Sequence, residues 1–531
     1  METQSIHQGS STAPGGDSTP LAIDSFHPIF SEFGPHYLIA QRLDGDDVYL
    51  LHGEIPPDVV KNVSSYLRGV HEYTFKESNE RGPVQNIHPG AYLRLVHLLS
   101  QASPGPLFPS LRSLRLHGPA SLDHLGLFLT PSLQTLEVVH IPEQDHVIVS
   151  NFLETLTEFG NESNLGEVTL GPGTICVDWC RACPKFDKLH TLKIVYESDT
   201  ALEYNLLTIL GDLPLLNSFE LDATLAKLYR DRTSIPVNER IIAPLPRRAW
   251  RNGVPPSLSS HTMVPTNRYS RLKQLSIEGS VELTRDLLSL IGSRELQKLT
   301  LHLISFPNSL QHDASQYLGL IDQCLTKWTN SLEDISLQFN QRMYSRPNST
   351  PTAPANETAR VIIYPNIPAT LAQNLVSPVN LTRLSISGLS LGYAALRMLL
   401  VTRQTTLKYL DLPVNNDTPC LQLLNLREIA LAFPNLLSLA CGIEFSTGLP
   451  RTEDFPPHCS ALSHGLNRLL LDPVDSNLPS TVQHADVARY VNSLFPNLTL
   501  ISPFSPWKKI SKSLKLLQTV RLDDLYRAPI I

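Results

Sequence analysis

The chain has 531 residues, of which 42% are hydrophobic and 18% are charged, a composition with which a globular protein can bury a core. Its formal net charge of −7 gives no overall attraction to nucleic acid or to an anionic membrane surface. No apolar stretch reaches the roughly 20 residues that a membrane-spanning helix needs. We therefore expect neither nucleic acid nor membrane as a partner.

Residues 1–22 open the chain and are rich in Ser, Thr, Gly and Pro, so we predict a disordered N-terminal lead. They lack the basic start and the apolar run of a secretory signal. The seven cysteines are an odd number spread over a long chain, which argues against a framework of disulfides. A cytoplasmic or nuclear protein is the expectation.

Residues 23–105 are predicted to form an N-terminal helical cap and a first degenerate repeat. The run Pro56-Pro57-Asp58 predicts the start of a helix, because proline and an acidic side chain both suit the first helical turn. Apolar residues continue from there at helical spacing, at Val63 and Leu67. A short strand is expected to follow directly, over residues 70–75.

A strand pattern then repeats along the chain. Each copy begins with a leucine and has apolar residues three and five positions later, and clear copies begin at Leu111, Leu133, Leu165, Leu189, Leu216, Leu272, Leu296, Leu332, Leu381, Leu407, Leu436 and Leu466. Most intervals are close to or slightly above the roughly 20–29 residues of leucine-rich repeats. Amphipathic helices separate the strands. The pattern predicts an α/β leucine-rich-repeat solenoid, a horseshoe with a parallel inner sheet and outer helices.

The predicted solenoid spans residues 106–503 and is interrupted by two loop insertions, at 228–270 and 341–360. The first loop is basic and rich in proline around Trp250, and it either contacts a partner or nucleic acid, or folds back on an acidic neighbouring face. Residues 504–531 are predicted to form a capping helix. Its stripe of Trp507, Ile510 and Leu514 would cover the last open edge of the sheet.

Side chains alternate across a strand, so the positions between the buried leucines should line the concave face. We expect a protein partner to bind there through Arg115, His117, Glu137, Lys193, Glu220, Asp222, Glu278, Lys298, Asp334, Arg383, Tyr409 and Asp411. Three of these, Glu220, Asp222 and Glu278, are locally unopposed and suggest an acidic patch that receives a basic segment of the partner. The alternative is a merely solvated sheet face. We expect the chain to be a monomer.

Cys176, Cys180 and Cys183 form the one cluster that could hold a metal, because their spacing resembles the iron–sulfur loop of radical enzymes that use S-adenosylmethionine. The apolar residues around Trp179 instead favour a packed helix with buried structural thiols. The sequence has no phosphate-binding glycine loop, no serine nucleophile elbow and no His-Glu-x-x-His motif. We therefore expect no catalytic residue, no metal and no cofactor, with a metalloenzyme as the weaker alternative.

The phrases Phe108-Pro-Ser-Leu-Arg-Ser-Leu114 and Phe433-Pro-Asn-Leu-Leu-Ser-Leu439 resemble the leucine-rich-repeat region of fungal F-box proteins, and the resemblance covers residues 40–527. It implies a substrate receptor whose N-terminal F-box docks on a Skp-type adaptor of a cullin ubiquitin ligase while the repeats hold the target. Residues 55–67 resemble the opening helix of an F-box, but the usual Leu-Val-Cys-x-x-Trp continuation is absent. Two functions stay open: a non-enzymatic protein-binding scaffold, or an active ligase receptor with a divergent docking module at residues 25–70.

Overall fold

The computed structural model describes residues 21–43, 46–75, 86–102, 104–118, 122, 124–172, 175, 177–196, 204–224, 268–305, 310–341, 364–413, 421–443, 464–473, 483–502 and 507–527. Within these ranges, fifteen strands belong to one parallel sheet and three strands form a second, smaller sheet. The chain divides into two compact units, Met1–Val195 and Tyr196–Ile531, which are described separately below as unit one and unit two.

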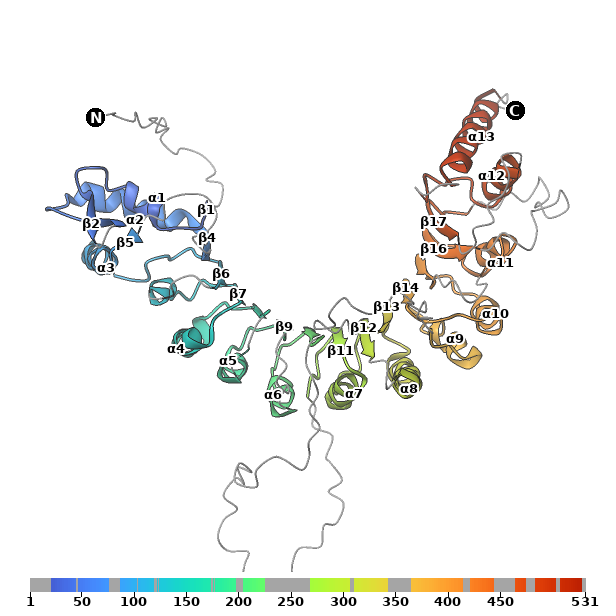
Figure 1. The fold of residues 1–531 in the computed structure, drawn as a ribbon, viewed down its shortest axis with the longest axis horizontal. Helices are drawn as coiled ribbons and strands as arrows, with labels where there is room; N and C mark the ends of the chain where they lie inside the picture. The colour runs from blue at the N-terminus through green and yellow to red at the C-terminus, as the bar shows by residue number, and fades with distance from the viewer. Residues whose placement is uncertain are drawn as a thin grey trace, which may run out of the picture. The chain divides into compact units, whose positions relative to one another are not determined.

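Unit one consists of a run of parallel strands with helices on one side (Figure 1). The strands, in sheet order, are β1 (Leu21–Ile23), β4 (Val70–Phe75), β6 (Ser113–His117), β7 (Thr135–Val139), β8 (Glu167–Leu170) and β9 (Thr191–Val195). The helices are α1 (His27–Ser31), α2 (Pro57–Gly69), α3 (Pro89–Ala102), α4 (His146–Thr157) and α5 (Val177–Ala182), with a 3-10 turn η1 at Leu125–Phe128. The second sheet contains β2 (Leu38–Leu43), β3 (Asp46–Leu51) and β5 (Asn86–Ile87).

Unit two repeats the same plan. Its strands, in sheet order, are β10 (Ser218–Asp222), β11 (Gln274–Gly279), β12 (Lys298–Ser305), β13 (Asp334–Gln341), β14 (Arg383–Ser387), β15 (Tyr409–Asp411), β16 (Ser438–Ile443), β17 (Arg468–Pro473) and β18 (Leu500–Ile501). Its helices are α6 (Tyr204–Leu210), α7 (Val281–Leu290), α8 (Leu310–Trp328), α9 (Ala369–Leu375), α10 (Tyr393–Val401), α11 (Asn425–Ala432), α12 (Gln483–Leu494) and α13 (Trp507–Arg527). Helices α7 to α12 lie on one side of the strands (Figure 1).

The leucines that begin the predicted copies form the core. All of them are buried: Leu111, Leu189, Leu272, Leu296, Leu332, Leu381, Leu407, Leu436 and Leu466 are 0% exposed, and Leu133, Leu165 and Leu216 are 1% exposed. Each buried leucine contributes roughly 2 kcal/mol of hydrophobic stabilisation relative to an exposed one. Together with the parallel sheet, this confirms the predicted α/β leucine-rich-repeat solenoid.

The first described residues of unit one form a strand that the sequence pattern does not predict. β1 pairs in parallel with β4, and Ile23 on this strand is buried. The predicted disordered lead, which extended to residue 22, is therefore too long at its C-terminal end. The helix predicted from Pro57 is confirmed as α2, and it buries Val63 and Leu67.

Aromatic side chains form the core at this end of unit one. Phe26 contacts the rings of Tyr73 and Phe128, with centroid distances of 5.6 Å to each. Phe108 stacks on Phe128, with ring centroids 4.8 Å apart and an angle of 3° between the planes. These rings tie α1, β4 and η1 to the turn before β6, because aromatic pairs gain from specific geometry as well as from burial.

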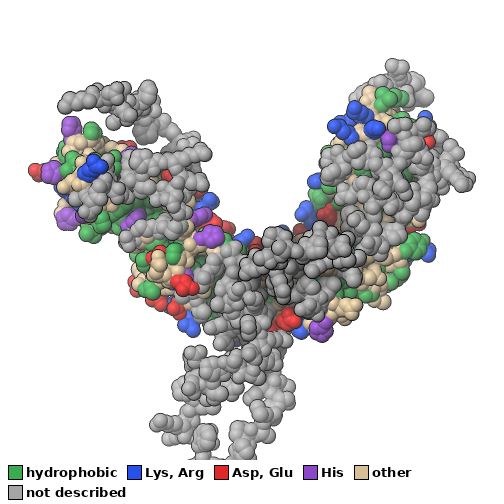
Figure 2. All heavy atoms as spheres, in the orientation of Figure 1, with side chains coloured by type: hydrophobic (Ala, Val, Ile, Leu, Met, Phe, Trp, Pro, Cys, Tyr) green, Lys and Arg blue, Asp and Glu red, His purple; other side chains and the backbone are tan. Residues whose placement is uncertain are grey.

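The C-terminal helix α13 buries Trp507, Ile510 and Leu514, as the predicted stripe requires. Lys508, Lys509, Lys512 and Lys515 are exposed, and Figure 2 shows Lys and Arg side chains gathered at this end of unit two. The helix thus covers apolar side chains with one face and presents charge to solvent with the other, as a terminal cap of a repeat array must.

Polar side chains join one repeat to the next. Asn380, Asn435 and Asn497, each directly before a repeat leucine, donate to backbone carbonyls of the preceding repeat, and Ser, Thr and His side chains do the same elsewhere. The Ser, Thr and His side chains donate hydrogen bonds of 2.7–2.9 Å to backbone carbonyls of the preceding repeat: Ser132 to Leu111, Ser293 to Leu272, Ser331 to Leu296, Thr406 to Leu381, and His464 to Phe433. An unpaired buried carbonyl costs about 1–3 kcal/mol. These cross-repeat hydrogen bonds avoid that cost at carbonyls between the strands.

One of these bonds depends on a neutral histidine. His464 Nε2–H donates to the carbonyl of Phe433 at 2.9 Å, while Nδ1 accepts from the backbone N–H of Leu466 at 3.1 Å. Burial lowers the pKa of His464, and the hydrogen bond to Phe433 opposes this in part. A histidine with a lowered folded-state pKa contributes stability that is present above its unfolded-state pKa and is lost as the pH falls.

We therefore expect the melting temperature to fall between pH 7.5 and pH 5.0, and part of this fall to disappear in His464→Gln. Glutamine can donate and accept at the same two places but cannot be protonated in this range. The measurement is the melting temperature of both proteins at the two pH values, with His52→Gln, an exposed position, as the control. An unchanged pH dependence in His464→Gln would contradict this role for the imidazole.

Candidate protein-interaction face

The open face is the side of the parallel sheet that the helices leave uncovered in each unit (Figure 1). Alternation on β12 shows how it is built: Leu299 and Leu301 are buried, whereas Lys298 is exposed and Thr300 and His302 are half-buried. The inward positions hold the core, and the outward positions are polar. The residues predicted for the concave face therefore lie on the open face of the two units.

In unit one, the open face brings three predicted residues together. Arg115 lies opposite Glu137 in the register of β6 and β7, with 3.4 Å between Nε and Oε2. His117 Nε2 is 4.0 Å from the other oxygen of Glu137. Lys193 lies two strands away on β9, opposite Thr169. The charges are half-exposed, so the pair contributes about 0–1 kcal/mol to stability and stays accessible to a partner.

In unit two, a second group of predicted residues forms a row across adjacent strands, which we call the charged row. Lys298, Asp334, Arg383 and Tyr409 lie opposite one another in the register of β12 to β15. The guanidinium carbon of Arg383 is 4.7 Å from the ring centroid of Tyr409. Cation–π contact of this kind at an exposed site contributes about 0.5–1 kcal/mol and restricts the orientation of both side chains.

Two carboxylates on this face are held in an unfavourable environment. Burial raises the pKa of Asp411, and the charge of Arg383, a hydrogen bond from Ser385 and the charge of Arg468 oppose the rise. Burial likewise raises the pKa of Asp334, opposed by Arg383 and Lys298. Both carboxylates are thus less well stabilised as anions than in water. A positive charge from a bound partner would correct this.

The Asp411 carboxylate gives a pH prediction. A raised folded-state pKa means that the stability contribution is complete below the unfolded-state pKa and is lost as the pH rises through the folded-state value. At pH 7, we expect the melting temperature of Asp411→Asn to equal or exceed that of the wild type. As the pH falls from 7 to 4, the melting temperature of the wild type should rise relative to that of the variant. Melting curves across this range check it. A variant whose deficit grows toward neutral pH would contradict it.

Beside the charged row lies a row of short hydroxyl side chains, which we call the hydroxyl row. Ser276, Thr300, Ser336 and Ser385 lie opposite one another across β11 to β14, and all four are half-buried. On its other side lie Glu278, His302 and Gln338, also in register. Hydroxyls both donate and accept hydrogen bonds, so this strip can pair with either kind of backbone group.

The acidic patch is in the predicted place but is not unopposed. Asp222 and Glu278 are directly opposite in the register of β10 and β11, and Glu220 lies opposite Ser276. However, Glu278 Oε2 is 3.7 Å from His302 Nδ1, and Asp222 accepts a hydrogen bond from the backbone N–H of Thr224 at 3.1 Å. The prediction of locally unopposed carboxylates is therefore wrong, because the next strand supplies an imidazole.

The described part of the cysteine cluster is buried, with Cys180 in α5 and Cys183 in the 3-10 turn that follows it. Cys180 and Cys183 are 0% and 1% exposed, and Cys183 Sγ donates to the carbonyl of Trp179 at 3.4 Å. Burial raises the pKa of Cys183 to about 12, which favours the protonated thiol over the thiolate that binds metals. Among the described residues, no group of three His, Cys, Asp or Glu could hold a metal ion.

Several predictions concern parts of the chain outside the described residues. Cys176 is one of them, as are the basic loop around Trp250 and the second insertion from residue 342 onward. None of the helices that the structure describes has the length and apolar character needed to cross a bilayer.

No protein-family model matches the chain, and no curated protein matches it either. Among solved structures, an internalin from Listeria monocytogenes is 12% identical, with a TM-score of 0.32 and 86% of each chain covered. A leucine-rich-repeat protein from Leptospira interrogans is 14% identical, with a TM-score of 0.32, 83% of this chain covered and 91% of that chain covered. The fold assignment rests on the parallel sheet and the leucine core described above.

Proposed function

We propose that the chain is a non-enzymatic scaffold that binds another protein on the open face of unit two. The observation that carries the proposal is the hydroxyl row, which lies in direct register across β11 to β14 between two rows of longer polar side chains. Strands about 4.8 Å apart give this row a length of about 14 Å. That length suits about four residues of an extended polypeptide.

The charges next to the hydroxyl row favour a basic segment of the partner. Glu220 lies opposite Ser276 at one end of the row, and Asp222 and Glu278 lie side by side in the adjacent row. Asp334 and Asp411 are carboxylates whose pKa values are raised by burial, so an added cation stabilises them. Lys298 and Arg383 limit where such a cation can sit, and so they contribute to specificity more than to affinity.

In unit one we propose Arg115, His117, Glu137 and Lys193 as contacts for the same or a further protein. The Arg115–Glu137 pair fixes the guanidinium at 3.4 Å from the carboxylate. A guanidinium held in this way is pre-organised for a partner carboxylate, which lowers the entropy cost of binding.

Quantitative affinity capture from cells of the source organism tests the proposal. Ser336→Lys places a long, charged side chain in the centre of the hydroxyl row, whereas Leu431→Lys makes a similar change at a 47% exposed position on α11. We expect proteins captured by the wild type to be lost with Ser336→Lys and retained with Leu431→Lys. Equal capture by all three proteins would show that the open face of unit two does not bind the captured proteins.

A second candidate is an active receptor of a cullin-type ubiquitin ligase. It is favoured by α2, which forms over Pro57–Gly69 where the sequence resembles the opening helix of an F-box. Against it, residues 38–51 fold as the antiparallel pair β2 and β3, and β4 follows α2 at once. Titration with a purified Skp-type adaptor separates the two candidates. Saturable binding that is lost in Lys61→Glu, an exposed position on α2, would support the receptor.

A further inference from the structure

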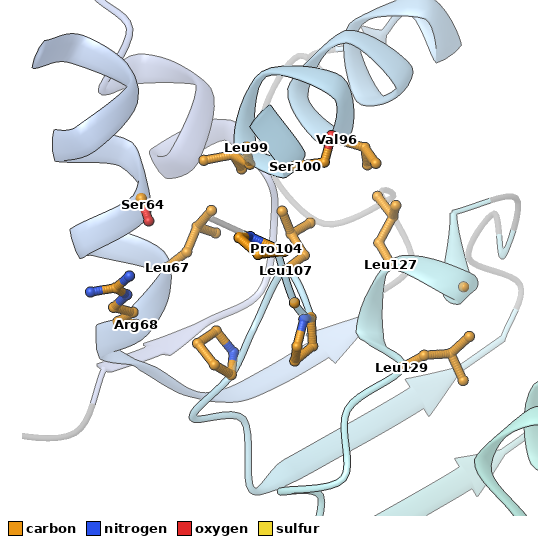
Figure 3. Close-up of a pocket in the computed structure, with 14 residues that line it drawn as sticks. Ser64, Leu67, Arg68, Val96, Leu99, Ser100, Pro104, Leu107, Leu127 and Leu129 are labelled. Carbon is orange, nitrogen blue, oxygen red and sulfur yellow. The ribbon is translucent and has the colours of Figure 1, made fainter. Parts of the chain in front are cut away.

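Unit one contains a pocket of about 320 Å³ away from the open face. It lies between α2, α3, the turn before β6 and the 3-10 turn η1 (Figure 3). Most of its lining side chains are aliphatic: Leu67 comes from α2, Val96 and Leu99 from α3, Leu107 from the turn, and Leu127 and Leu129 from η1 and the residues after it. Ser64, Ser100 and Arg68 add polar groups to the lining. A cavity of about 150 Å³ accommodates one benzene-sized group. This pocket therefore has room for about two large apolar side chains.

Buried aromatic residues and prolines restrict the walls of the pocket. Leu107 and Leu127 each precede an aromatic residue of the N-terminal core, and those residues, Phe108 and Phe128, are fully buried and stacked at 4.8 Å. Pro104 and Pro106 in the lining restrict the backbone of the turn between α3 and β6. The pocket is thus pre-organised, so ordering its walls adds little conformational-entropy cost to ligand binding.

The apolar surface continues out of the pocket along α3. Val96 lines the pocket and is 37% exposed, and Leu93, one helical turn earlier, is 74% exposed. Two exposed aliphatic side chains that extend an apolar pocket form a contiguous patch. Patches of this kind mark sites where soluble proteins bind other molecules.

One charged side chain lines the pocket. Arg68 lies at the C-terminal end of α2 and is exposed (Figure 3). No carboxylate of the described residues forms an ion pair with it, whereas elsewhere in unit one Arg115 and Arg181 are paired with Glu137 and Asp178. A guanidinium beside an apolar pocket presents a rigid fork of donors that a carboxylate matches with two hydrogen bonds.

We propose that this pocket binds an amphipathic segment of a partner protein that inserts two large apolar side chains and places an Asp or Glu carboxylate against Arg68. The apolar side chains fill the volume between α2, α3 and η1, and an additional apolar residue covers Leu93 and Val96. This site is built from helices and turns, not from the open face, and it is independent of the function proposed for unit two.

The test uses a phage-displayed library of 12-residue peptides panned against the full chain. We expect selected peptides to share two spaced large apolar residues and an acidic residue. Val96→Asp places a charge in the apolar wall at a partly exposed position, so it should weaken binding of a fluorescein-labelled selected peptide at least about tenfold in an anisotropy titration. Leu516→Asp, a change at a 67% exposed residue of α13, is the matched control and should leave binding unchanged.

A charge swap then tests the carboxylate. Arg68→Glu should weaken binding of the selected peptide. A peptide whose acidic residue is replaced by Lys should bind Arg68→Glu again but should bind the wild type weakly. Peptides without an acidic residue, or peptides that bind Val96→Asp as tightly as the wild type, would overturn the proposal. A library that yields no consensus sequence would also overturn it. If an apolar dye then binds the wild type but not Val96→Asp, the pocket binds a small apolar ligand instead of a peptide. Ser336→Lys should bind the peptide normally, so failure here and failure of the open-face proposal are distinguishable.

Discussion

Trp328→Ala should destabilise unit two by about 4 kcal/mol, because it removes a large side chain from a close-packed core. Trp328 ends α8 and is 1% exposed. Its Nε1–H donates to the carbonyl of Ser293 at 2.7 Å, and Ser293 in turn donates through its hydroxyl to the carbonyl of Leu272 at 2.7 Å. The indole and the Ser293 hydroxyl together connect three successive repeats, and loss of the indole leaves the Ser293 carbonyl without this donor.

Hydrogen exchange of the β11–β13 amides, followed by mass spectrometry, is the suitable measurement, because repeat arrays can lose stability locally instead of all at once. Trp328→Phe is the control: it keeps most of the ring volume, loses the hydrogen bond, and should cost only about 1–2 kcal/mol. Exchange rates in Trp328→Ala within a few-fold of the wild type would show that the repeats do not depend on this connection.

Gly388→Ala should cost at least about 3 kcal/mol, although it adds one methyl group. Gly388 follows β14 and has a φ of 66°, in the left-handed region that costs other residues about 1–2 kcal/mol. A Cβ at this position would lie 1.8 Å from the carbonyl oxygen of Phe339 on β13, which is far inside contact distance. The backbone of two neighbouring strands would have to separate, and this adds to the conformational cost.

Gly319→Ala is the matched comparison. Gly319 lies within α8, and a Cβ there has nothing within 4 Å. Alanine should raise stability at this helical position by about 0.5–1 kcal/mol. In urea unfolding, the midpoint of Gly388→Ala should therefore lie below that of the wild type, and the midpoint of Gly319→Ala should lie above it. Equal midpoints would contradict the close approach of β13 and β14 at Gly388.

The repeat pattern was predictable from sequence because it reflects a strong physical constraint. A leucine at the start of each copy, with apolar residues three and five positions later, must face a core on one side of a strand. All twelve predicted copies begin at a buried leucine, from Leu111 to Leu466. The capping helix followed for the same reason, since Trp507 and Ile510 can only be buried on one face of a helix.

The side-chain environment of the open face was less accessible to sequence reasoning. The list of outward residues included Arg383, Tyr409 and Asp411, but their contacts depend on which strands are neighbours and on the register between them. Register also places Glu278 beside His302, which changes an apparently unopposed acidic residue into one of a pair. The four members of the hydroxyl row are spread over more than 100 positions, from Ser276 to Ser385, so no local motif indicates that they form one strip.

The pocket in unit one could not have been predicted from the sequence at all. Leu67, Val96 and Leu127 look like ordinary core residues of an amphipathic helix or turn, and whether a space remains between them depends on how α2 and α3 pack. β1 was missed because three residues are too short for a periodicity signal.

Site-specific photo-crosslinking in cells can show whether a protein binds the open face of unit two. A benzophenone amino acid replaces Thr300 or Ser385 in the hydroxyl row, and, as a control, the exposed Leu431 on α11. We expect irradiation in cells of the source organism to yield the same protein adduct from both open-face positions and none from position 431. Adducts from position 431 alone would contradict it, as would a complete absence of adducts from the open face.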